Sequence, residues 1–163
     1  MTRLRCLLLA AACSLGVACD RPASGSTLTP DAAAGVVAGP TAEEMAGIEA
    51  AIQHYLHGIA EPDRARLGQA FDEANATMVR AVRNDAGVIE VSARKDMAEV
   101  LDEWGARTEP PTGALGSEIL DVRVLDHRLA LVSVRYWNTV YDALILARLP
   151  QGWVIVAKAY TDQ

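Results

Sequence analysis

The feature that most constrains the fold is a series of four alternating apolar segments towards the C-terminus. They cover residues 119–125, 129–137, 140–149 and 153–160. The candidate connections between them are Asp126-His127, Asn138-Thr139 and Pro150-Gln151. Period-two segments rich in branched and aromatic residues are typical of strands, and strands joined by such short links pair antiparallel. The sequence therefore predicts an antiparallel meander.

The preceding residues alternate between helical and strand patterns. Thr41 and Glu44 form a capping box, which predicts a helix start, and apolar residues continue at helical spacing to Ile59. A short helix is expected over residues 63–71, and a third helix is expected to start from a Ser92 cap. In the third helix, Met97, Val100, Leu101 and Trp104 form one stripe that is expected to be buried. Before it, residues 77–83 and 88–92 are predicted to form two strands. This order predicts an α+β fold in which helices cover one face of a bent sheet.

Residues 1–18 have the organisation of an export signal. Arg3 and Arg5 precede an apolar stretch, which ends in the small residues Gly16-Val17-Ala18. A transmembrane helix would need about 20 apolar residues, and Asp20-Arg21 interrupts the run too early. We therefore expect residues 1–18 to be removed during export.

Cys19 is the predicted lipid-attachment site. The sequence Leu15 to Cys19 resembles the lipobox of bacterial lipoproteins, although Gly16 stands where a branched residue is usual. Cleavage before Cys19 removes Cys6 and Cys13, so the mature chain keeps one cysteine and no disulfide partner for it. Residues 19–40 are then the lipidated cysteine and a flexible tether, and residues 41–163 the folded domain. The expected location is the cell membrane, lipid-anchored and facing the periplasm or exterior; secretion is the alternative if Cys19 is not lipidated.

The charge balance excludes several partner classes. The whole chain has a net charge of −6, and loss of Arg3 and Arg5 with the signal makes it −8. An acidic domain of this kind is not expected to bind nucleic acid, or an anionic membrane surface by electrostatics. Membrane attachment is therefore expected through the lipid anchor only.

Two stretches carry a resemblance to a known family. They are IQHYLHGIAEPDRARLGQAF, residues 52–71, and YDALILARLPQGWVIVAKAY, residues 141–160. With them, residues 41–162 resemble the nuclear transport factor 2-like superfamily and, within it, the lumazine-binding-like family, related to polyketide-cyclase-like and ketosteroid-isomerase-like proteins. The resemblance implies a cone-shaped, strongly bent antiparallel sheet with three helices on its concave face. It does not imply one function, because this superfamily uses the cone for enzymes, binding proteins and dimeric adaptors.

Carrying the alternation from strand to strand groups a polar set on one sheet face. The set is Ser133, Arg135 and Asp142, beside Trp137 and opposite the small residues of the last strand. We expect a ligand pocket there, with Tyr55 and Trp104 from the helices as further lining. A simple Arg135–Asp142 ion pair is the alternative for the polar set, and core packing is the alternative for Tyr55 and Trp104.

The opposite face is also apolar, which predicts a homodimer. Its expected members include Tyr136, Ile145 and Val156. A sheet buried on one side only would be polar on the other, so a second subunit is the simplest cover.

The residues favour binding over catalysis. In an alignment with the ketosteroid isomerases, Tyr55 matches their donor tyrosine, but the two catalytic carboxylates fall at Val79 and Leu144. The isomerases abstract a proton next to a carbonyl group, which requires a base and a hydrogen-bond donor for the enolate. Because neither carboxylate is present here, no catalytic residue is predicted. No metal-binding or cofactor motif is present, and His54 and His57 lie on the predicted wet face of the first helix.

The expected function is the binding of an unidentified small, partly apolar molecule. Lumazine itself is not inferred, because a flat ring calls for stacking aromatics and the candidates are few. Two alternatives stay open. One is a small enzyme with Asp142 as base and Tyr55 or Arg135 stabilising an oxyanion; a carboxylate that titrates below its free value would argue against it. The other is a dimeric adaptor with a closed interior.

Overall fold

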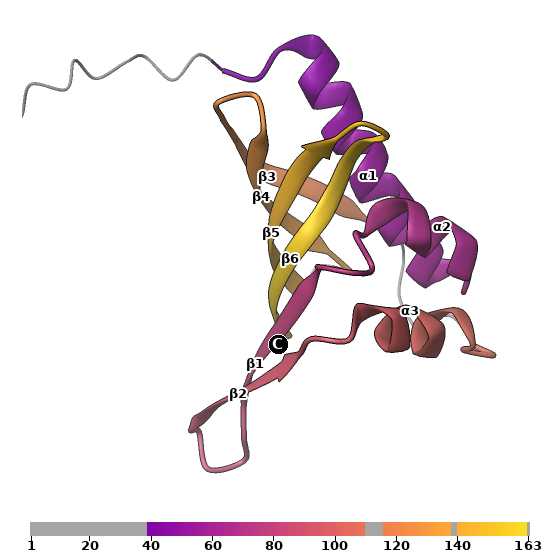
Figure 1. Cartoon of the computed structure of the whole chain (residues 1–163). Helices are drawn as coiled ribbons and strands as arrows, with labels where there is room; N and C mark the ends of the chain where they lie inside the picture. Colours follow the sequence, from indigo (N-terminus) through magenta and orange to yellow (C-terminus); the bar gives the residue numbers. More distant parts are fainter. Residues whose placement is uncertain (1–38, 110–115, 138–139, 163) are drawn as a thin grey trace, which may run out of the picture. The chain divides into compact units, whose positions relative to one another are not determined.

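The computed structural model describes residues 39–109, 116–137 and 140–162. Within this part the chain forms three helices and a six-stranded sheet that does not close into a barrel (Figure 1). This confirms the predicted α+β class. The export signal, Cys19 and nearly all of the tether lie outside the described residues.

The first two helices form where the sequence predicts them, and a side chain caps the start of each. Helix α1 (Ala42–Ala60) starts from Thr41, whose side chain accepts from the Glu44 backbone while the Glu44 carboxylate accepts from the Thr41 backbone. Helix α2 (Arg64–Ala70) starts from Asp63, which accepts from the backbone of Arg66. Pro62 lies between the helices, where it removes a backbone donor and favours a break.

Helix α3 (Met97–Gly105) forms, but its predicted cap was wrong. Asp96 caps it by accepting from the backbone of Glu99, and Ser92 lies inside the preceding strand. Aspartate and serine cap helices about equally well, so capping preference alone could not decide between Ser92 and Asp96. The predicted stripe is buried: Met97, Val100, Leu101 and Trp104.

The six strands form one sheet in the order β2-β1-β6-β5-β4-β3. They are β1 (Thr77–Arg83), β2 (Ile89–Arg94), β3 (Ser117–Leu125), β4 (Leu129–Tyr136), β5 (Val140–Leu149) and β6 (Gly152–Asp162). The four-strand meander β3 to β6 is confirmed. The sheet as a whole is mixed, because β1 pairs parallel with β6.

The register between β4 and β5 differs by one residue from the sequence prediction. Strand β4 ends at Tyr136 and β5 begins at Val140, so the link has three residues where two were expected. Arg135 therefore lies opposite Tyr141, and Asp142 lies opposite Val134. Because side chains alternate, this one-residue shift sends Ser133 and Arg135 to the face opposite Asp142.

A bulge between β5 and β6 makes a second change of face. Ile145 lies opposite Ala157, but the next residue, Leu146, lies opposite Ile155. The extra residue on β6 reverses the alternation, so that Lys158 and Tyr160 share a face with Asp142 while Ala157 and Ala159 do not.

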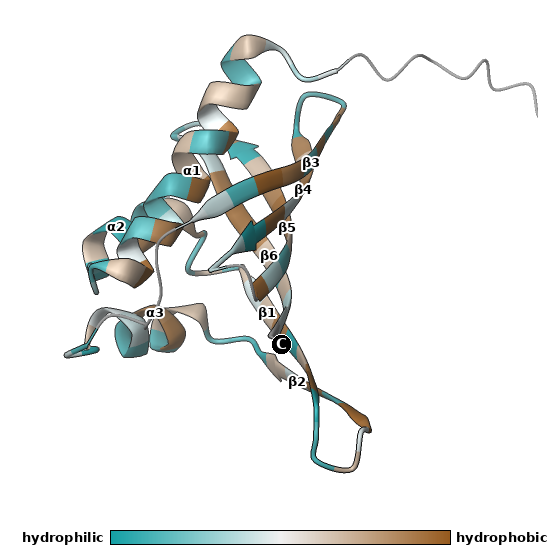
Figure 2. Cartoon of the chain, turned by 180° about the vertical axis from the view of Figure 1, so that it is seen from behind, coloured by the Kyte–Doolittle hydropathy of each residue, from teal (hydrophilic) through white to brown (hydrophobic). Residues whose placement is uncertain are grey.

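The helices pack on one face of this sheet, which we call the inner face (Figure 1). Its buried strand residues join α1, α2 and α3 in a single core, and hydrophobic positions of the helices turn towards the sheet (Figure 2). The strand members of the core on the four meander strands are Val124, Ala130, Val132, Val134, Tyr136, Leu144, Leu146, Trp153 and Ile155. No described helix has the length and hydropathy needed to cross a membrane.

Candidate functional site

Two charged side chains are buried on the inner face. Asp142 of β5 and Lys158 of β6 are each only 3% exposed, and the Lys158 Nζ forms an ion pair with the Asp142 Oδ1. Asp142 pairs in register with Tyr160 and Lys158 with Leu144, so the two side chains are diagonal neighbours on adjacent strands. The bulge on β6 is what brings the lysine to this side of the sheet.

Two tyrosine hydroxyls extend the polar cluster. The Tyr55 hydroxyl, from α1, donates to the Asp142 Oδ2 at 2.9 Å and lies 3.2 Å from the Tyr136 hydroxyl of β4. Tyr55 is fully buried and Tyr136 nearly so. A hydrogen-bonded chain thus runs from Tyr136 through Tyr55 to Asp142 and Lys158. We call these four residues the inner cluster.

Aromatic rings enclose the ammonium group. The Lys158 Nζ lies 5.1 Å from the Tyr55 ring centroid, 5.7 Å from that of Tyr136 and 4.3 Å from that of Tyr160. Each distance is within the range of a cation–π attraction, which is stronger where water is excluded. Three rings and one carboxylate therefore compensate the buried positive charge in place of water.

Burial favours the neutral forms in the inner cluster. It raises the pKa of Asp142, against the opposing effects of Lys158 and of the Tyr55 hydrogen bond. It lowers the pKa of Lys158 to about 8, although Asp142 opposes the shift. It also raises the pKa of Tyr55, with the Asp142 charge acting in the same direction. Tyr55 therefore remains a hydrogen-bond donor throughout the physiological range.

A small pocket adjoins the cluster at Tyr136. Its volume is about 50 Å³, and its lining residues are Gln53, Leu56, His57, Gly116, Ser117 and Tyr136. We call it the α1–β4 pocket. Next to it, Trp137 packs edge-on against Tyr136 with ring centroids 4.7 Å apart, and Trp137 has a φ of 52°. A positive φ is uncommon for a bulky residue, and residues with such strained backbone conformations cluster at functional sites.

The structure divides the predicted pocket residues between the two sheet faces. Tyr55 and Asp142 meet in the inner cluster, and Trp104 packs on the Tyr55 ring at 6.1 Å. Ser133 and Arg135 lie on the opposite face, where Arg135 forms an ion pair with Glu118. The predicted Arg135–Asp142 neighbourhood was wrong, because the register differs by one residue.

The sequence prediction missed Lys158, Tyr136 and Tyr160 as parts of the site. The sequence prediction had grouped all three with Ile145 rather than with Asp142, because neither the three-residue link after Tyr136 nor the bulge on β6 was anticipated. One signal was present: Lys158 is one of only two lysines in the chain, and it stands within the apolar strand sequence WVIVAKAY. A lone lysine in a buried strand requires a compensating carboxylate, and Asp142 stands in the neighbouring strand.

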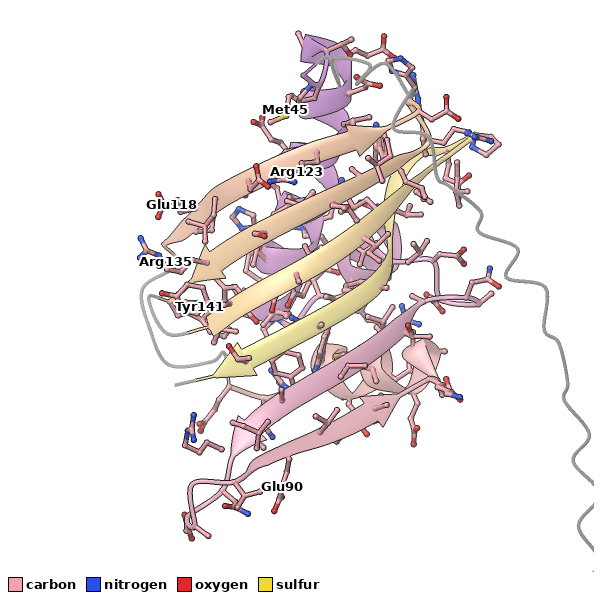
Figure 3. All side chains as sticks on the ribbon, turned by 90° about the vertical axis from the view of Figure 1, so that its left-hand side faces the viewer. Met45, Glu90, Glu118, Arg123, Arg135 and Tyr141 are labelled. Carbon is pink, nitrogen blue, oxygen red and sulfur yellow. The ribbon has the colours of Figure 1, made fainter. Side chains whose placement is uncertain are left out.

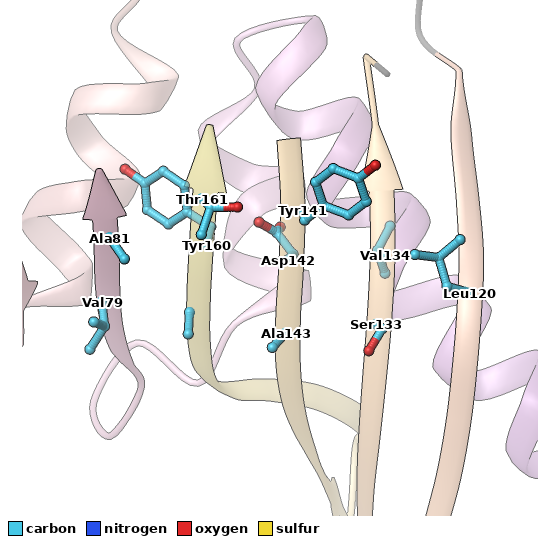
Figure 4. Close-up of a pocket in the computed structure, with 11 residues that line it drawn as sticks. Val79, Ala81, Leu120, Ser133, Val134, Tyr141, Asp142, Ala143, Tyr160 and Thr161 are labelled. Carbon is cyan, nitrogen blue, oxygen red and sulfur yellow. The ribbon is translucent and has the colours of Figure 1, made fainter. Parts of the chain in front are cut away.

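A larger hollow lies on the sheet face away from the helices, the outer face. It has a volume of about 380 Å³ and is lined mainly by small and apolar side chains, including Val79, Ala81, Ser133, Ala143 and Ala159 (Figure 4). The space that the alanines of β6 were expected to leave therefore exists, but it opens on the face away from the helices, and Asp142 is the only member of the inner cluster among its described lining residues.

A third hollow, of about 530 Å³, lies among α1, α2 and the β5–β6 turn around Trp153. Its lining in the described part of the chain includes no lysine, arginine or carboxylate. Across residues 39–109, 116–137 and 140–162, no group of three histidine, cysteine or acidic side chains is arranged to hold a metal ion. The inner cluster is thus the strongest candidate for recognition chemistry.

Comparisons with known proteins agree with this fold. The sequence profile of a family described as "Putative lumazine-binding" matches residues 43–161. No functionally curated protein shows significant similarity to the chain.

Solved structures with the same fold come from several bacteria. A nuclear transport factor 2-like protein of unknown function from Methylobacillus flagellatus is 18% identical, with a TM-score of 0.59 over 76% of this chain and 95% of that one. A cystatin-like fold protein from Burkholderia xenovorans is 21% identical, with a TM-score of 0.56 over 75% and 93%. A ketosteroid isomerase-like protein from Erwinia carotovora is 17% identical, with a TM-score of 0.53 over 75% and 98%. At these identities the likeness shows the fold alone.

Proposed function

Because the chain belongs to the lumazine-binding-like family, we propose that it is an exported, membrane-tethered domain that binds a small, partly apolar molecule without catalysis. The binding site is the α1–β4 pocket, and the inner cluster behind it supplies the recognition groups. The family description suggests ligand binding but does not specify the ligand of this chain, since one fold serves many functions.

The buried Asp142–Lys158 pair carries the proposal. Removing a charge from water costs several kcal/mol per ion, and apolar residues of similar volume often stabilise a core as well or better. Apolar residues would fill this part of the core without the cost of burying two charges, so the pair points to a role other than packing. Buried charges with shifted pKa values concentrate at functional sites, and here they connect through Tyr55 to a tyrosine that lines a pocket.

The geometry restricts the chemistry of the ligand. A volume of about 50 Å³ admits only a few heavy atoms, whereas pockets for whole ligands measure roughly 300–1,000 Å³. The polar end of the molecule therefore enters, where Tyr136, Gln53 and Ser117 offer hydroxyl and amide groups. Its apolar body stays outside, because the pocket is too small to hold it. A carbonyl or hydroxyl group on a compact hydrophobic skeleton meets these demands.

The test combines native mass spectrometry of the purified chain with a thermal-shift screen of small carbonyl and hydroxyl compounds. A binder should stabilise the wild type and lose most of its effect in Tyr136→Phe, which removes one hydroxyl from the cluster. Tyr141→Phe is the matched control, since it removes a hydroxyl from the outer face. Equal stabilisation of both variants, or no binder together with a crystal structure that has a filled pocket, would refute the proposal.

A second candidate function is catalysis with Asp142 as a general base. Burial raises the pKa of this carboxyl, which is the direction that a base near neutral pH requires. Against it, Tyr55 and Lys158 already engage the carboxylate oxygens, and Arg135 lies on the other face and cannot assist. Exchange of α-protons of small ketones in deuterated buffer, followed by NMR, tests this role: exchange by the wild type that Asp142→Asn abolishes would support an enzyme.

A further inference from the structure

The 530 Å³ hollow around Trp153, which we call the Trp153 hollow, lies on the helix side of the sheet. One wall is the β5–β6 turn, which lies beside α1 in Figure 1. The facing wall is a row of α1 residues at helical spacing: Gly47, Ala50, Ala51 and His54. This row starts after Met45, which lies behind the sheet in Figure 3. The Trp153 hollow and the α1–β4 pocket share none of their described lining residues.

The Trp153 indole brings an unused hydrogen-bond donor to this hollow. Trp153 is 93% buried, yet its N–H donates to no group in the described part of the chain. The ring edge that carries the N–H faces α1, because a Cβ added to Gly47 would lie 2.6 Å from the Trp153 Cδ1 and 3.4 Å from its Nε1. Gly47 and Trp153 both line the hollow. A buried indole N–H usually has a partner, so this one points to an acceptor bound in the hollow.

Small residues give the hollow room for a whole ligand. A volume of about 530 Å³ lies within the range of roughly 300–1,000 Å³ that is usual for small-molecule sites. Gly152 has a φ of 128°, a conformation that favours glycine, so the turn that holds Trp153 in place adds no side chain there. Gly68 of α2 also lines the hollow without a side chain. A ring with substituents can therefore approach the helix backbone closely.

The polar groups of the hollow suit a neutral ligand rich in hydroxyl groups. They are the side chains of His54, Gln69 and Gln151 and the Trp153 indole. Amide side chains both donate and accept, as hydroxyl groups do, and the indole only donates. The described lining has no lysine, arginine or carboxylate, so a charged ligand would lose hydration without gaining a counter-charge. An extended peptide would pair with a strand edge, whereas β5 and β6 are interior strands of the sheet.

We propose that the Trp153 hollow is a second ligand site, which binds a neutral saccharide. The Trp153 N–H donates to a sugar oxygen, and His54, Gln69 and Gln151 exchange hydrogen bonds with its hydroxyl groups. The C–H surface of the sugar ring packs on the small residues of α1. This site has no lining residue in common with the α1–β4 pocket, so either proposal can fail without the other.

Proton–nitrogen NMR spectra of the chain carrying Cys19→Ser test the site, since that substitution excludes any contribution of a lipid. The probes are glucose, N-acetylglucosamine and their disaccharides, and the reporter is the Trp153 indole N–H signal, assigned by through-bond experiments. At least one probe should shift this signal downfield at millimolar concentration, because the N–H gains an acceptor. The charged counterparts glucuronic acid and glucosamine should bind at least about tenfold more weakly, because the lining offers no counter-charge.

Two variants separate the site from other causes of binding, with dissociation constants measured from the ligand signals. Ala50→Leu occupies part of the hollow and should weaken binding at least about tenfold. Ala46→Leu is the matched control, because it makes the same change at an exposed α1 position outside the described lining, and it should leave the dissociation constant unchanged. Trp153→Phe removes the N–H and should weaken binding about fivefold, the effect of one hydrogen bond.

If Trp153→Phe does not fold, as judged by circular dichroism, the comparison of Ala50→Leu with Ala46→Leu still decides. The proposal is overturned if no neutral saccharide shifts the Trp153 signal, or if Ala50→Leu binds as tightly as Ala46→Leu. Equal binding of the charged counterparts overturns the assignment of a neutral ligand. A shift caused by trialanine and by no saccharide overturns the saccharide and assigns the hollow to a peptide.

Discussion

Asp142 and Lys158 show how strongly single residues are constrained in the core between the helices and the inner face of the sheet. Each is tolerable only because the other is present, and because the Tyr55 hydroxyl and three aromatic rings, including that of Tyr55, replace the lost hydration. The pair is therefore a source of fragility when broken and contributes little net stability when intact.

Asp142→Asn should lower the free energy of unfolding by about 3–5 kcal/mol, because it leaves the Lys158 ammonium buried without a counter-charge. Replacing both residues by apolar ones, Asp142→Leu with Lys158→Met, should restore stability to near the parent value. Urea denaturation monitored by circular dichroism measures both. If Asp142→Asn lowers the free energy of unfolding by less than the double variant does, the two residues are not coupled as the structure indicates.

Glu44 has a second role beyond its helix cap. It is 2% exposed and accepts from the Thr41 backbone at 2.8 Å, and the His127 Nδ1 lies 2.7 Å from its other oxygen. The Thr41 hydrogen bond, aided by His127, lowers the pKa of Glu44 from 4.5 to about 2. His127 lies in the β3–β4 turn, so this carboxylate fastens the start of α1 to the sheet.

The lowered pKa predicts an acid-dependent loss of stability. The folded state holds the Glu44 carboxylate ionised more strongly than the unfolded state does, so its contribution is present above pH 4.5 and is lost as the pH falls towards 2. Glu44→Gln should show a flatter stability profile in that window, as measured by urea midpoints at successive pH values. Glu43→Gln, at an exposed neighbour, is the control and should follow the parent profile. Parallel profiles for the parent and Glu44→Gln would contradict this assignment.

At the scale of the elements, the helices meet at glycines. A Cβ added to Gly58 of α1 would lie 2.7 Å from the Leu67 Cγ and 3.1 Å from the Leu67 backbone nitrogen. Leu67 is fully buried on α2, so it cannot move aside. The close approach of α1 and α2 thus depends on the absence of a side chain at position 58.

Gly58→Ala should destabilise the domain by about 1–3 kcal/mol, because overpacking outweighs the gain in helix propensity. Gly68→Ala, in the middle of α2, is the informative comparison. Its Cβ would meet only the ends of the Glu73 and Arg64 side chains, which can shift. That variant should be neutral or slightly stabilising. Thermal unfolding of the two proteins would reveal the contrast, and similar melting temperatures would refute it.

The elements also show where sequence reasoning succeeds. The capping box at Thr41 and the buried stripe of α3 are local patterns. They were predictable because capping depends on neighbouring residues and because a helix buries one face at a fixed period. The register was not predictable to one residue. A three-residue link after Tyr136 and a bulge opposite Ile145 each shift the alternation, and neither has a strong signal in the sequence.

At the scale of the whole molecule, the anchor that we propose and the folded domain would make separate contributions. The proposed tether would hold the folded domain near the membrane without a spanning helix. A single acyl chain gives only marginal membrane binding, and stable anchoring takes a second chain or a second signal.

Cys19→Ser should therefore release the protein from the membrane fraction into the soluble fraction. Cell fractionation with immunoblotting measures the distribution, and mass spectrometry of the parent protein should find the lipid on Cys19. The folded domain should be unaffected, because Cys19 precedes residues 41–163 and those residues contain no cysteine. Equal membrane retention of the variant would contradict the anchor.

The sequence by itself determined the α+β class, the meander and the first two helices, because these depend on local periodicity and capping that each segment encodes for itself. It also placed Tyr55 and Asp142, two members of the candidate site, on the interior side. The tertiary structure alone decided that Lys158, Tyr136 and Tyr160 join them, and that Ser133 and Arg135 do not. The physical reason is that side chains along a strand alternate between the two faces of the sheet. One additional residue in a turn or bulge therefore moves every following side chain of that strand to the opposite face.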